Sequence, residues 1–272
     1  MKHRRRAKVM NILITGAWRE AKNFISQLES MGHSVEFMQH QDSPLPCAFS
    51  WPEAVVCSTM FSYYDIEKFT NLKFIQCESA GIDHFPMDYI RQNNITFKNA
   101  PGVYSIPIAE YVVGGILQIY KDSFGFYKKQ GQHKWDKNRE LFELTNKNVF
   151  ILGTGSIGTE IAKRLKAFDC KTIGFNRFGN NADFFDEVHS INNFKAIVKD
   201  ADILISALPL DKSTKHLIDD GVLSTLKKDT VIVNVSRGAI VDTGALLKHI
   251  NYIKGAVLDV FEDEPLPENS PL

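Results

Sequence analysis

Short apolar runs alternate with amphipathic stretches along most of this chain. In the first third, the apolar runs are VMNILITG, SVEFMQH, EAVVCST and LKFIQCES, and helical patterns lie between them near Ala21–Met31 and Tyr64–Phe69. Buried strands separated by amphipathic helices are typical of βαβ units and parallel sheets. The pattern therefore predicts an α/β domain with a doubly wound parallel sheet over residues 1–99.

A second series of the same kind begins at Val149, with the runs VFIL, KTIGF, ADILISALP, TVIVNVS and GAVLDVF. Between the two series, a Pro-Gly turn leads into the apolar helical stretch PIAEYVVGGILQIY and then into a polar stretch that contains Trp135. A length of 272 residues fits roughly two domains. We therefore predict a second doubly wound parallel-sheet domain over residues 100–272, with its elements between about Pro101 and Glu264.

Composition narrows the classes of partner. Hydrophobic residues make up 44% and charged residues 24%, which are ordinary globular values. Lys+Arg and Asp+Glu balance at 32 each, so no overall field favours nucleic acid or a membrane surface. The opening MKHRRRAKVM lacks the apolar region of a secretory signal, and no apolar run reaches the roughly 18 residues that span a bilayer. We expect a cytoplasmic protein, with Met1–Lys8 as an extension.

The cysteines and histidines give no sign of a metal site. Cys47, Cys57, Cys77 and Cys170 form no CxxC pair and no cluster with histidine. Three of these cysteines lie in or beside apolar runs, so buried free thiols in a reducing compartment are expected.

Gly153, Gly155 and Gly158 form the pattern GxGxxG directly after an apolar strand, and they open an amphipathic helix. In this context the first glycine permits a tight turn, the second lets the backbone approach a pyrophosphate, and the third allows close helix–strand packing. The helix N-terminus offers free N–H groups to the phosphates. The pattern predicts dinucleotide binding, with a structural turn as the alternative. The similar stretch NILITGA continues as Trp18-Arg19-Glu20 without further glycines, and we interpret it as the end of a strand.

The end of the next strand indicates which dinucleotide is bound. Asn176 lies 176 − 158 = 18 residues after Gly158, near the position where an acid binds the ribose 2′-hydroxyl of NAD. Asparagine removes the negative charge that repels a 2′-phosphate, and Arg177 supplies a bidentate phosphate partner. NADP(H) is therefore favoured over NAD(H), and a solvated arginine at the strand end is the alternative interpretation.

Five stretches together resemble the D-isomer-specific 2-hydroxyacid dehydrogenases: ESAGIDHF, NAPGVYSIPIAEYVV, LGTGSIG, VIVNVSRGAIVDTGAL and GAVLDVFEDEPLP. They follow the order of that family and cover nearly the whole chain from about Asn11. The resemblance implies a flavodoxin-like substrate domain and a Rossmann cofactor domain, with a cleft between them. It implies an oxidoreductase that transfers a hydride between NAD(P)H and a small 2-oxoacid or D-2-hydroxyacid, such as glyoxylate, hydroxypyruvate or pyruvate.

Two other functions remain open at this point. A non-catalytic NAD(P)H sensor, comparable to corepressors related to the family, would use the same fold. A methyltransferase with a similar glycine turn is disfavoured by the two dehydrogenase motifs.

The resemblance also implies the role of each site residue. Arg237 matches the arginine that grips the substrate carboxylate and carbonyl, for which a planar fork of donors is suited. Glu264 matches the carboxylate that pairs with the family's catalytic histidine. Ala80 and Gly81 match the loop whose N–H groups bind the substrate carboxylate. The implied cofactor-binding residues are Gly153, Gly155, Ser156, Ile157, Gly158, Asn176, Arg177, Leu208, Pro209, Thr214, Val235, Ser236 and Asp259.

The chain departs from the family pattern after Glu264. The family's proton-donating histidine lies in a later Thr-Pro-His-type motif, and the sequence stops at Leu272 before such a motif. We therefore expect a truncated chain that binds NADP(H) but turns over slowly. His84, His216 and His249 match no catalytic position and are expected to be ordinary loop or surface residues.

The resemblance finally suggests a homodimer. The apolar helix Ile108–Tyr120 and the region of Trp135 resemble the stretch through which family members pair their cofactor domains. The alternative is that this helix only fills the core of its own domain.

Overall fold

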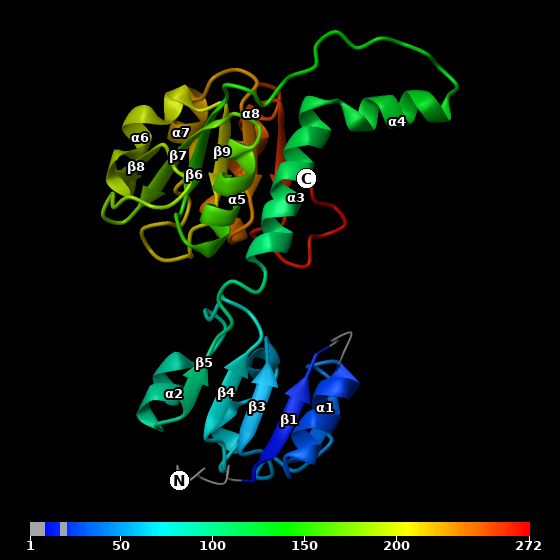
Figure 1. Cartoon of the computed structure of the whole chain (residues 1–272), viewed down its shortest axis with the longest axis vertical. Helices are drawn as coiled ribbons and strands as arrows, with labels where there is room; N and C mark the ends of the chain where they lie inside the picture. The colour runs from blue at the N-terminus through cyan, green and yellow to red at the C-terminus, as the bar shows by residue number, and fades with distance from the viewer. Residues whose placement is uncertain (1–8, 17–20) are drawn as a thin grey trace, which may run out of the picture. The chain divides into compact units, whose positions relative to one another are not determined.

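The computed structural model describes residues 9–16 and 21–272. The chain divides into two compact units, Met1–Val103 and Tyr104–Leu272, and each is described by itself below (Figure 1). The division falls a few residues after the boundary expected from the sequence. The expected extension Met1–Lys8 and the segment Trp18-Arg19-Glu20 lie outside the described residues.

Unit 1 contains a five-stranded parallel sheet in the order β2-β1-β3-β4-β5. Its strands are β1 (Asn11–Thr15), β2 (Ser34–Met38), β3 (Ala54–Cys57), β4 (Phe74–Cys77) and β5 (Thr96–Lys98). This is the flavodoxin-like order, which confirms the predicted fold class. Apolar side chains cover both faces: Leu13 packs in one cluster, whereas Ile12 and Ile14 pack in the other, as the two-residue period of a strand requires.

The helical elements of unit 1 are short. They are α1 (Ala21–Ser30), α2 (Met87–Gln92), and the 3₁₀ turns η1 (Met60–Ser62) and η2 (Ile66–Lys68). The helix expected over Tyr64–Phe69 is wrong, because only the single turn η2 forms there. The Asp65 side chain caps this turn by accepting the Glu67 N–H, and the backbone leaves helical geometry at Phe69. One turn is enough to bury Ile66 and Phe69.

Unit 2 contains a six-stranded parallel sheet in the order β11-β10-β9-β6-β7-β8. Its strands are β6 (Asn148–Leu152), β7 (Lys171–Asn176), β8 (Glu187–Ser190), β9 (Ile203–Ser206), β10 (Val231–Asn234) and β11 (Gly255–Leu258). Three strands extend to each side of the junction between β6 and β9, which is the Rossmann arrangement. The predicted Rossmann fold is therefore confirmed.

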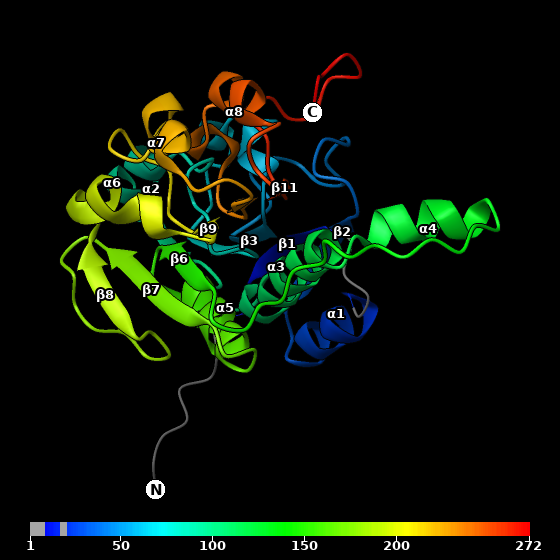
Figure 2. The same cartoon turned by 90° about the horizontal axis from the view of Figure 1, so that it is seen from above.

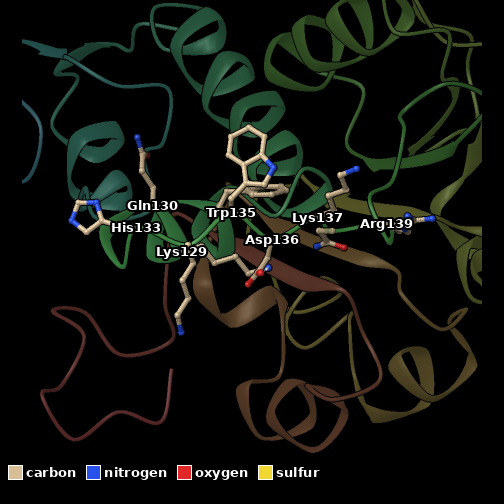
Figure 3. Close-up of a pocket in the computed structure, with 10 residues that line it drawn as sticks. Lys129, Gln130, His133, Trp135, Asp136, Lys137 and Arg139 are labelled. Carbon is tan, nitrogen blue, oxygen red and sulfur yellow. Dashed lines mark ion pairs between the residues drawn. The ribbon is translucent and has the colours of Figure 1, made fainter.

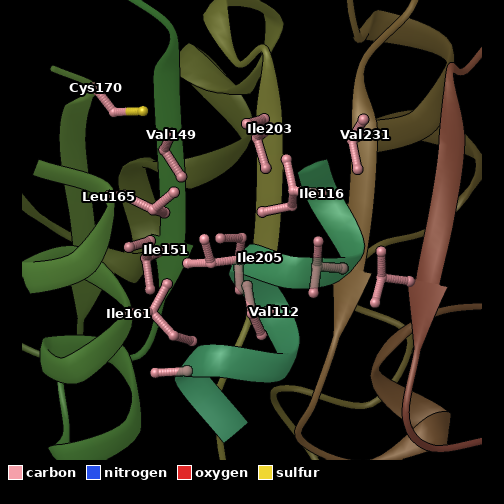
Figure 4. Close-up of a cluster of buried hydrophobic side chains, with 14 of the residues drawn as sticks. Val112, Ile116, Val149, Ile151, Ile161, Leu165, Cys170, Ile203, Ile205 and Val231 are labelled. Carbon is pink, nitrogen blue, oxygen red and sulfur yellow. The ribbon is translucent and has the colours of Figure 1, made fainter. Parts of the chain in front are cut away.

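Helices cover both faces of this sheet. The helices of unit 2 are α3 (Ser105–Tyr120), α4 (Ser123–Gly131), α5 (Ser156–Lys166), α6 (Phe194–Ile197), α7 (Asp220–Thr225) and α8 (Thr243–His249), with the 3₁₀ turns η3 (Ile191–Asn193), η4 (Val198–Asp200) and η5 (Gly238–Ile240). Of these, α4 buries none of its residues and does not cover the sheet. On one face, Val112 and Ile116 of α3 join Ile161 of α5 and the strand residues Ile151 and Ile205 in one buried cluster (Figure 4). A second cluster on the other face contains residues of α6, α7 and α8. A sheet with both faces buried explains why its strands read as continuous apolar runs.

Helix α4 and the segment that follows it project from the body of unit 2 (Figures 1 and 2). Phe124 and Tyr127 of α4 are exposed. By contrast, Val112, Val113, Ile116 and Tyr120 of α3 are buried in the core of unit 2. The core of unit 2 therefore accounts for one face of α3, while Ile106 and Tyr111 of the same helix are exposed.

Two further expectations from the sequence concern the cysteines and the length of the apolar helices. Cys57, Cys77 and Cys170 are buried free thiols and Cys47 is partly buried. No helix among the described residues is long and apolar enough to cross a lipid bilayer.

Candidate functional site

The turn after β6 lies where the strand order of unit 2 reverses. Gly153 has φ +100°, and a Cβ built there would lie 2.6 Å from the carbonyl oxygen of Ala207, directly after β9. A side chain would meet both a disfavoured backbone conformation and this close neighbour. The turn therefore occupies the junction between β6 and β9, which is the position at which open α/β sheets bind ligands.

Open space borders the backbone at Gly155, at the start of α5. A Cβ at Gly158 would lie 1.9 Å from the carbonyl oxygen of Gly153, so the helix packs directly against the turn. At Gly155, the N-cap of α5, a Cβ would meet nothing within 4 Å. Ser156 and Ile157 form the first turn of α5. Free N–H groups at a helix start, with open space beside them, fit the pyrophosphate of a dinucleotide.

Asn176, at the end of β7, shapes the loop that follows it. Its Oδ1 accepts hydrogen bonds from the N–H groups of Phe178, Gly179 and Asn180 at 3.2, 2.7 and 3.2 Å. Its Nδ2 donates to Thr154 Oγ1 at 3.0 Å, within the glycine turn. The side chain that was expected to face the ribose therefore also joins the two loops that would border it.

Arg177 is exposed on this loop. Its carbonyl oxygen accepts a hydrogen bond from Ser190 Oγ at 3.2 Å, which fixes its backbone. Within residues 9–16 and 21–272, its guanidinium takes part in no hydrogen bond or ion pair. The charge is therefore available to an anionic ligand.

The loop after β9 closes on itself beside the glycine turn. The buried hydroxyl of Thr214 donates to the carbonyl oxygen of Pro209 at 2.8 Å and accepts from the Asp211 N–H at 2.8 Å. Hydrogen bonds from Ser213, and further ones from Thr214, lower the pKa of Asp211. The Leu208 nitrogen would lie 3.3 Å from a Cβ at Gly153, so this loop borders the predicted cofactor position.

A buried polar network supports the turn after β10. Ser206 Oγ and Ser236 Oγ are 2.8 Å apart, and Ser236 Oγ donates to Asn234 Oδ1 at 2.7 Å. Asn234 Nδ2 donates to the carbonyl oxygen of Arg237 at 2.8 Å. Val235 is buried within this turn. The family motif assigned Ser236 to the cofactor site but did not assign Asn234 or Ser206. The sequence signal for these two was a single polar residue at the end of an otherwise apolar strand.

Arg237 and Glu264 follow neighbouring strands. Arg237 has extended backbone angles and is half-buried, and its Nη1 donates to the carbonyl oxygen of Ser236 at 2.8 Å. Glu264 lies beyond β11 and is exposed, and its carboxylate accepts the N–H of Phe261 at 2.8 Å. Asp259 lies directly after β11, where its N–H donates to the Asn234 carbonyl oxygen at 3.0 Å. Because β10 and β11 pair in parallel, the residues that follow them lie at the same end of the sheet, beyond the carboxyl ends of the two strands.

The loop with Ala80 and Gly81 follows β4 in unit 1. The Ala80 carbonyl oxygen accepts from Asn99 Nδ2 at 2.9 Å, and the Gly81 carbonyl oxygen accepts from Ser79 Oγ at 3.1 Å. The N–H groups of Ala80 and Gly81 have no acceptor in the described part of the chain. The carbonyls are thus held inside the loop, while two N–H donors are left for an anion.

A hollow of unit 2 lies away from the predicted site residues of that unit. It encloses about 1020 Å³ between α4 and the following segment, and its lining includes Lys129, His133, Trp135 and Arg139 (Figure 3). None of the predicted cofactor or substrate residues lines it. Trp135 is 93% exposed, so this hollow is a feature of the projecting segment.

Comparison with known proteins gives one consistent result. Residues 113–272 match the family model described as "D-isomer specific 2-hydroxyacid dehydrogenase, NAD binding domain". A glyoxylate reductase from Thermofilum pendens is 35% identical over 211 residues, which cover 74% of this chain and 62% of that protein. A D-3-phosphoglycerate dehydrogenase from Methanocaldococcus jannaschii is 31% identical over 211 residues, which cover 76% of this chain and 40% of that protein. The chain thus spans less than two thirds of the length of these relatives.

A solved structure shares nearly the whole fold. The D-isomer specific 2-hydroxyacid dehydrogenase family protein from Aeromonas salmonicida superimposes with a TM-score of 0.86 and 26% identity. The match covers 97% of this chain and 86% of that one. The similarity therefore includes both units.

Proposed function

This chain belongs to the D-isomer specific 2-hydroxyacid dehydrogenase family, and on that premise we propose that it transfers a hydride between NAD(P)H and a small 2-oxoacid. The reverse reaction would oxidise a D-2-hydroxyacid. The observation that carries the proposal is the open glycine turn at the β6–β9 junction, next to the strand ends that hold Arg237 and Glu264. The bound dinucleotide would supply the hydride.

The residues of unit 2 would bind and polarise the oxoacid. The Arg237 guanidinium can donate two parallel hydrogen bonds to a carboxylate or to the carbonyl that accepts the hydride. Its carbonyl oxygen is held by the buried Asn234 amide, so its backbone is fixed before the ligand arrives. The Glu264 carboxylate would stabilise a positively charged partner at the same carboxyl end of the sheet. In unit 1, the N–H groups of Ala80 and Gly81, which have no acceptor among residues 9–16 and 21–272, are suited to the carboxylate of the same class of ligand.

We propose that the preferred cofactor is NADPH, with NADH as the alternative. Asn176 brings no negative charge to the position that an acid occupies in NAD-binding proteins. The guanidinium of Arg177, which has no partner among the described residues, lies one residue later, on a loop whose shape the Asn176 hydrogen bonds fix. This pairing supports recognition of a 2′-phosphate.

The non-catalytic alternative has no comparable support, because the relatives named above carry the names of enzymes. Homodimer formation is also proposed, through the region of the apolar helix Ile108–Tyr120 and Trp135, where Tyr111, the aromatic side chains of α4 and Trp135 are exposed. A cytoplasmic location without nucleic-acid or membrane partners remains a prediction from the sequence.

Binding measurements test the proposal directly on the 272-residue chain. NADPH fluorescence should change on binding, and oxamate, which imitates a 2-oxoacid, should bind to the NADPH complex. Arg237→Gln should weaken oxamate binding by roughly 10- to 150-fold, the range for losing a hydrogen bond to a charged group. NADPH affinity should change little.

Arg91→Gln is the matched control, since Arg91 is an exposed arginine of unit 1. Absence of dinucleotide binding by the folded chain would reject the proposed function.

A further inference from the structure

His216 and Glu262 are not assigned to the proposed reaction, yet they join loops that follow two different strands. His216 Nε2 lies 2.6 Å from Glu262 Oε1, within hydrogen-bonding distance. The other carboxylate oxygen of Glu262 accepts the N–H of Thr243 at 2.8 Å, at the start of α8. Glu262 is therefore held by the loop after β9 and by the first residue of α8 at the same time.

The backbone around His216 is also fixed to the segment after Arg237. The N–H of His216 donates to the Ala239 carbonyl oxygen at 2.8 Å, and the N–H of Ile218 donates to Ile240 at 3.1 Å. His216 has φ +50°, in the left-handed region that histidine adopts more readily than most residues. The imidazole is thus presented to Glu262 by a backbone with little freedom.

Glu262 belongs to a segment that lies against the Arg237 turn. A Cβ built at Gly238 would lie 1.9 Å from the carbonyl carbon and oxygen of Phe261. Only a glycine allows the two backbones to approach so closely. The same segment continues to Glu264, whose carboxylate accepts the Phe261 N–H. The His216–Glu262 bond therefore fastens the Glu264 segment over the turn that carries Arg237.

The charges around the pair favour this arrangement. Burial alone would raise the pKa of Glu262, but hydrogen bonds from Thr243 and His216 outweigh it and lower the pKa below its ordinary value. The carboxylate is therefore ionised at neutral pH. Asp242 Oδ2 lies 3.9 Å from His216 Nδ1, so a second carboxylate faces the other side of the ring. The side chains of His216 and Glu262 are 38% and 27% exposed, so water weakens the attraction without removing it.

We propose that His216 and Glu262 are positioning residues for Arg237. By fixing the segment after β11 against Gly238, they hold the guanidinium in the orientation that binds a 2-oxoacid. The inference rests on the proposed function, because that proposal assigns Arg237 to the oxoacid.

The test compares oxamate and NADPH binding in variants of the whole chain. His216→Ala should weaken oxamate binding to the NADPH complex by about tenfold, the scale for one hydrogen bond to a charged group. NADPH affinity should change much less, because the hydrogen bonds of Thr214 with Pro209 and Asp211 hold the cofactor side of the loop after β9 without His216. His216→Gln keeps a donor for Glu262 and should restore most of the oxamate affinity. A general loss of stability would weaken both ligands and would not be rescued in this way.

His249→Ala is the matched control. His249 makes the same kind of contact, with its Nε2 2.7 Å from Asp220 Oδ1, but it lies at the opposite end of α8. It should leave both affinities unchanged. Glu262→Ala should resemble His216→Ala, and the double variant should lose about tenfold, not the roughly hundredfold of two independent effects.

Amide exchange of residues 259–264 separates this inference from the proposed function. His216→Ala should speed exchange there whether or not the chain binds oxamate. Wild-type protein that fails to bind oxamate while the exchange effect appears would overturn the proposed function alone. Unchanged exchange in His216→Ala, or an oxamate affinity equal to that of His249→Ala, would overturn the positioning role. If His216→Ala does not fold, Glu262→Gln is measured in the same way. Faster exchange of residues 259–264 with weaker oxamate binding would support the positioning role, and wild-type values of both would overturn it.

Discussion

At the scale of single residues, Asn176 determines the shape of the loop that carries Arg177. One amide oxygen accepts three N–H groups, and the amide nitrogen reaches Thr154 in the glycine turn. An aspartate could accept the same three bonds but could not donate to Thr154. The asparagine therefore does more than remove a negative charge, because it connects the two loops that would border the adenosine ribose.

Arg177→Ala should weaken NADPH binding by about 1–3 kcal/mol, the scale for losing a charge-assisted hydrogen bond. NADH binding should be nearly unchanged, because NADH lacks the 2′-phosphate. Fluorescence titration with both cofactors measures the difference, and Arg91→Ala serves as the control for removing an exposed arginine. An equal loss for both cofactors would show that Arg177 does not read the 2′-phosphate.

The sequence allowed the motif residues of unit 2 to be predicted, but not the side chains that support them. Gly153, Gly155 and Arg237 lie in short motifs whose spacing carries their chemistry. Asn234 and Ser206 act through a buried network between neighbouring strands, and such a network depends on strand order, which a single sequence does not display. His216 meets Glu262 across a separation of 46 residues, for the same reason.

At the scale of elements, the start of α5 uses two glycines for different physical reasons. Gly158 is required by packing, because a Cβ there would lie 1.9 Å from the Gly153 carbonyl oxygen. Gly155 borders open space and has extended backbone angles, φ −75° and ψ −167°, that any residue adopts. One glycine is therefore a condition of the fold, and the other is a condition of ligand approach.

The variants Gly155→Ala and Gly158→Ala should separate these two conditions. Gly155→Ala should leave the melting temperature unchanged, while its methyl group obstructs the pyrophosphate and weakens NADPH binding by roughly tenfold or more, a loss of about 1.4 kcal/mol. Gly158→Ala should lower stability by about 1–3 kcal/mol, as overpacking does. Thermal melts and NADPH titrations of the two variants measure both effects. Strong NADPH binding by Gly155→Ala would mean that the phosphates do not lie over this turn.

Elements were predictable where their apolar pattern was continuous. β6, β9 and β10 are buried on both faces and were evident as apolar runs. β8 was not predicted, because its sequence EVHS is polar and only partly buried at the edge of the sheet. α2 was also missed, since six residues with one buried side chain give no helical period.

At the scale of the whole molecule, unit 2 contains everything that a Rossmann domain needs. Its six strands lie in one sheet, and two buried clusters cover the two faces. The predicted cofactor residues all lie within Tyr104–Leu272. Only Ala80 and Gly81 of the predicted site belong to unit 1.

Residues 104–272, produced alone, should fold and bind NADPH with an affinity close to that of the whole chain. Circular dichroism and NADPH titration give the answer. An unfolded fragment would show that unit 2 depends on unit 1, and a folded fragment that does not bind NADPH would reject the cofactor site proposed for unit 2.

The proposed homodimer predicts a dimeric mass in sedimentation at micromolar concentration. Trp135→Ala should shift the chain toward the monomer, because Trp135 is 93% exposed and large aromatic side chains dominate interfaces. Tyr63→Ala, which removes an exposed aromatic residue of unit 1, should have no such effect. A monomeric wild-type mass would remove the dimer from the proposed function.

The order β11-β10-β9-β6-β7-β8 also predicts how easily each strand of unit 2 opens locally. β6 and β9 have a neighbour on each side and fully buried interiors, so their amides should open only with global unfolding. β11 pairs with β10 alone among the described strands, and edge elements open at lower free energy. The glycine turn follows β6, which should open least often, whereas Glu264 lies beyond β11, which should open more often. The cofactor part of the predicted site is therefore more rigid than the part that contains Glu264. A rigid dinucleotide platform would then border a segment whose order depends on the His216–Glu262 hydrogen bond and not on a second neighbouring strand.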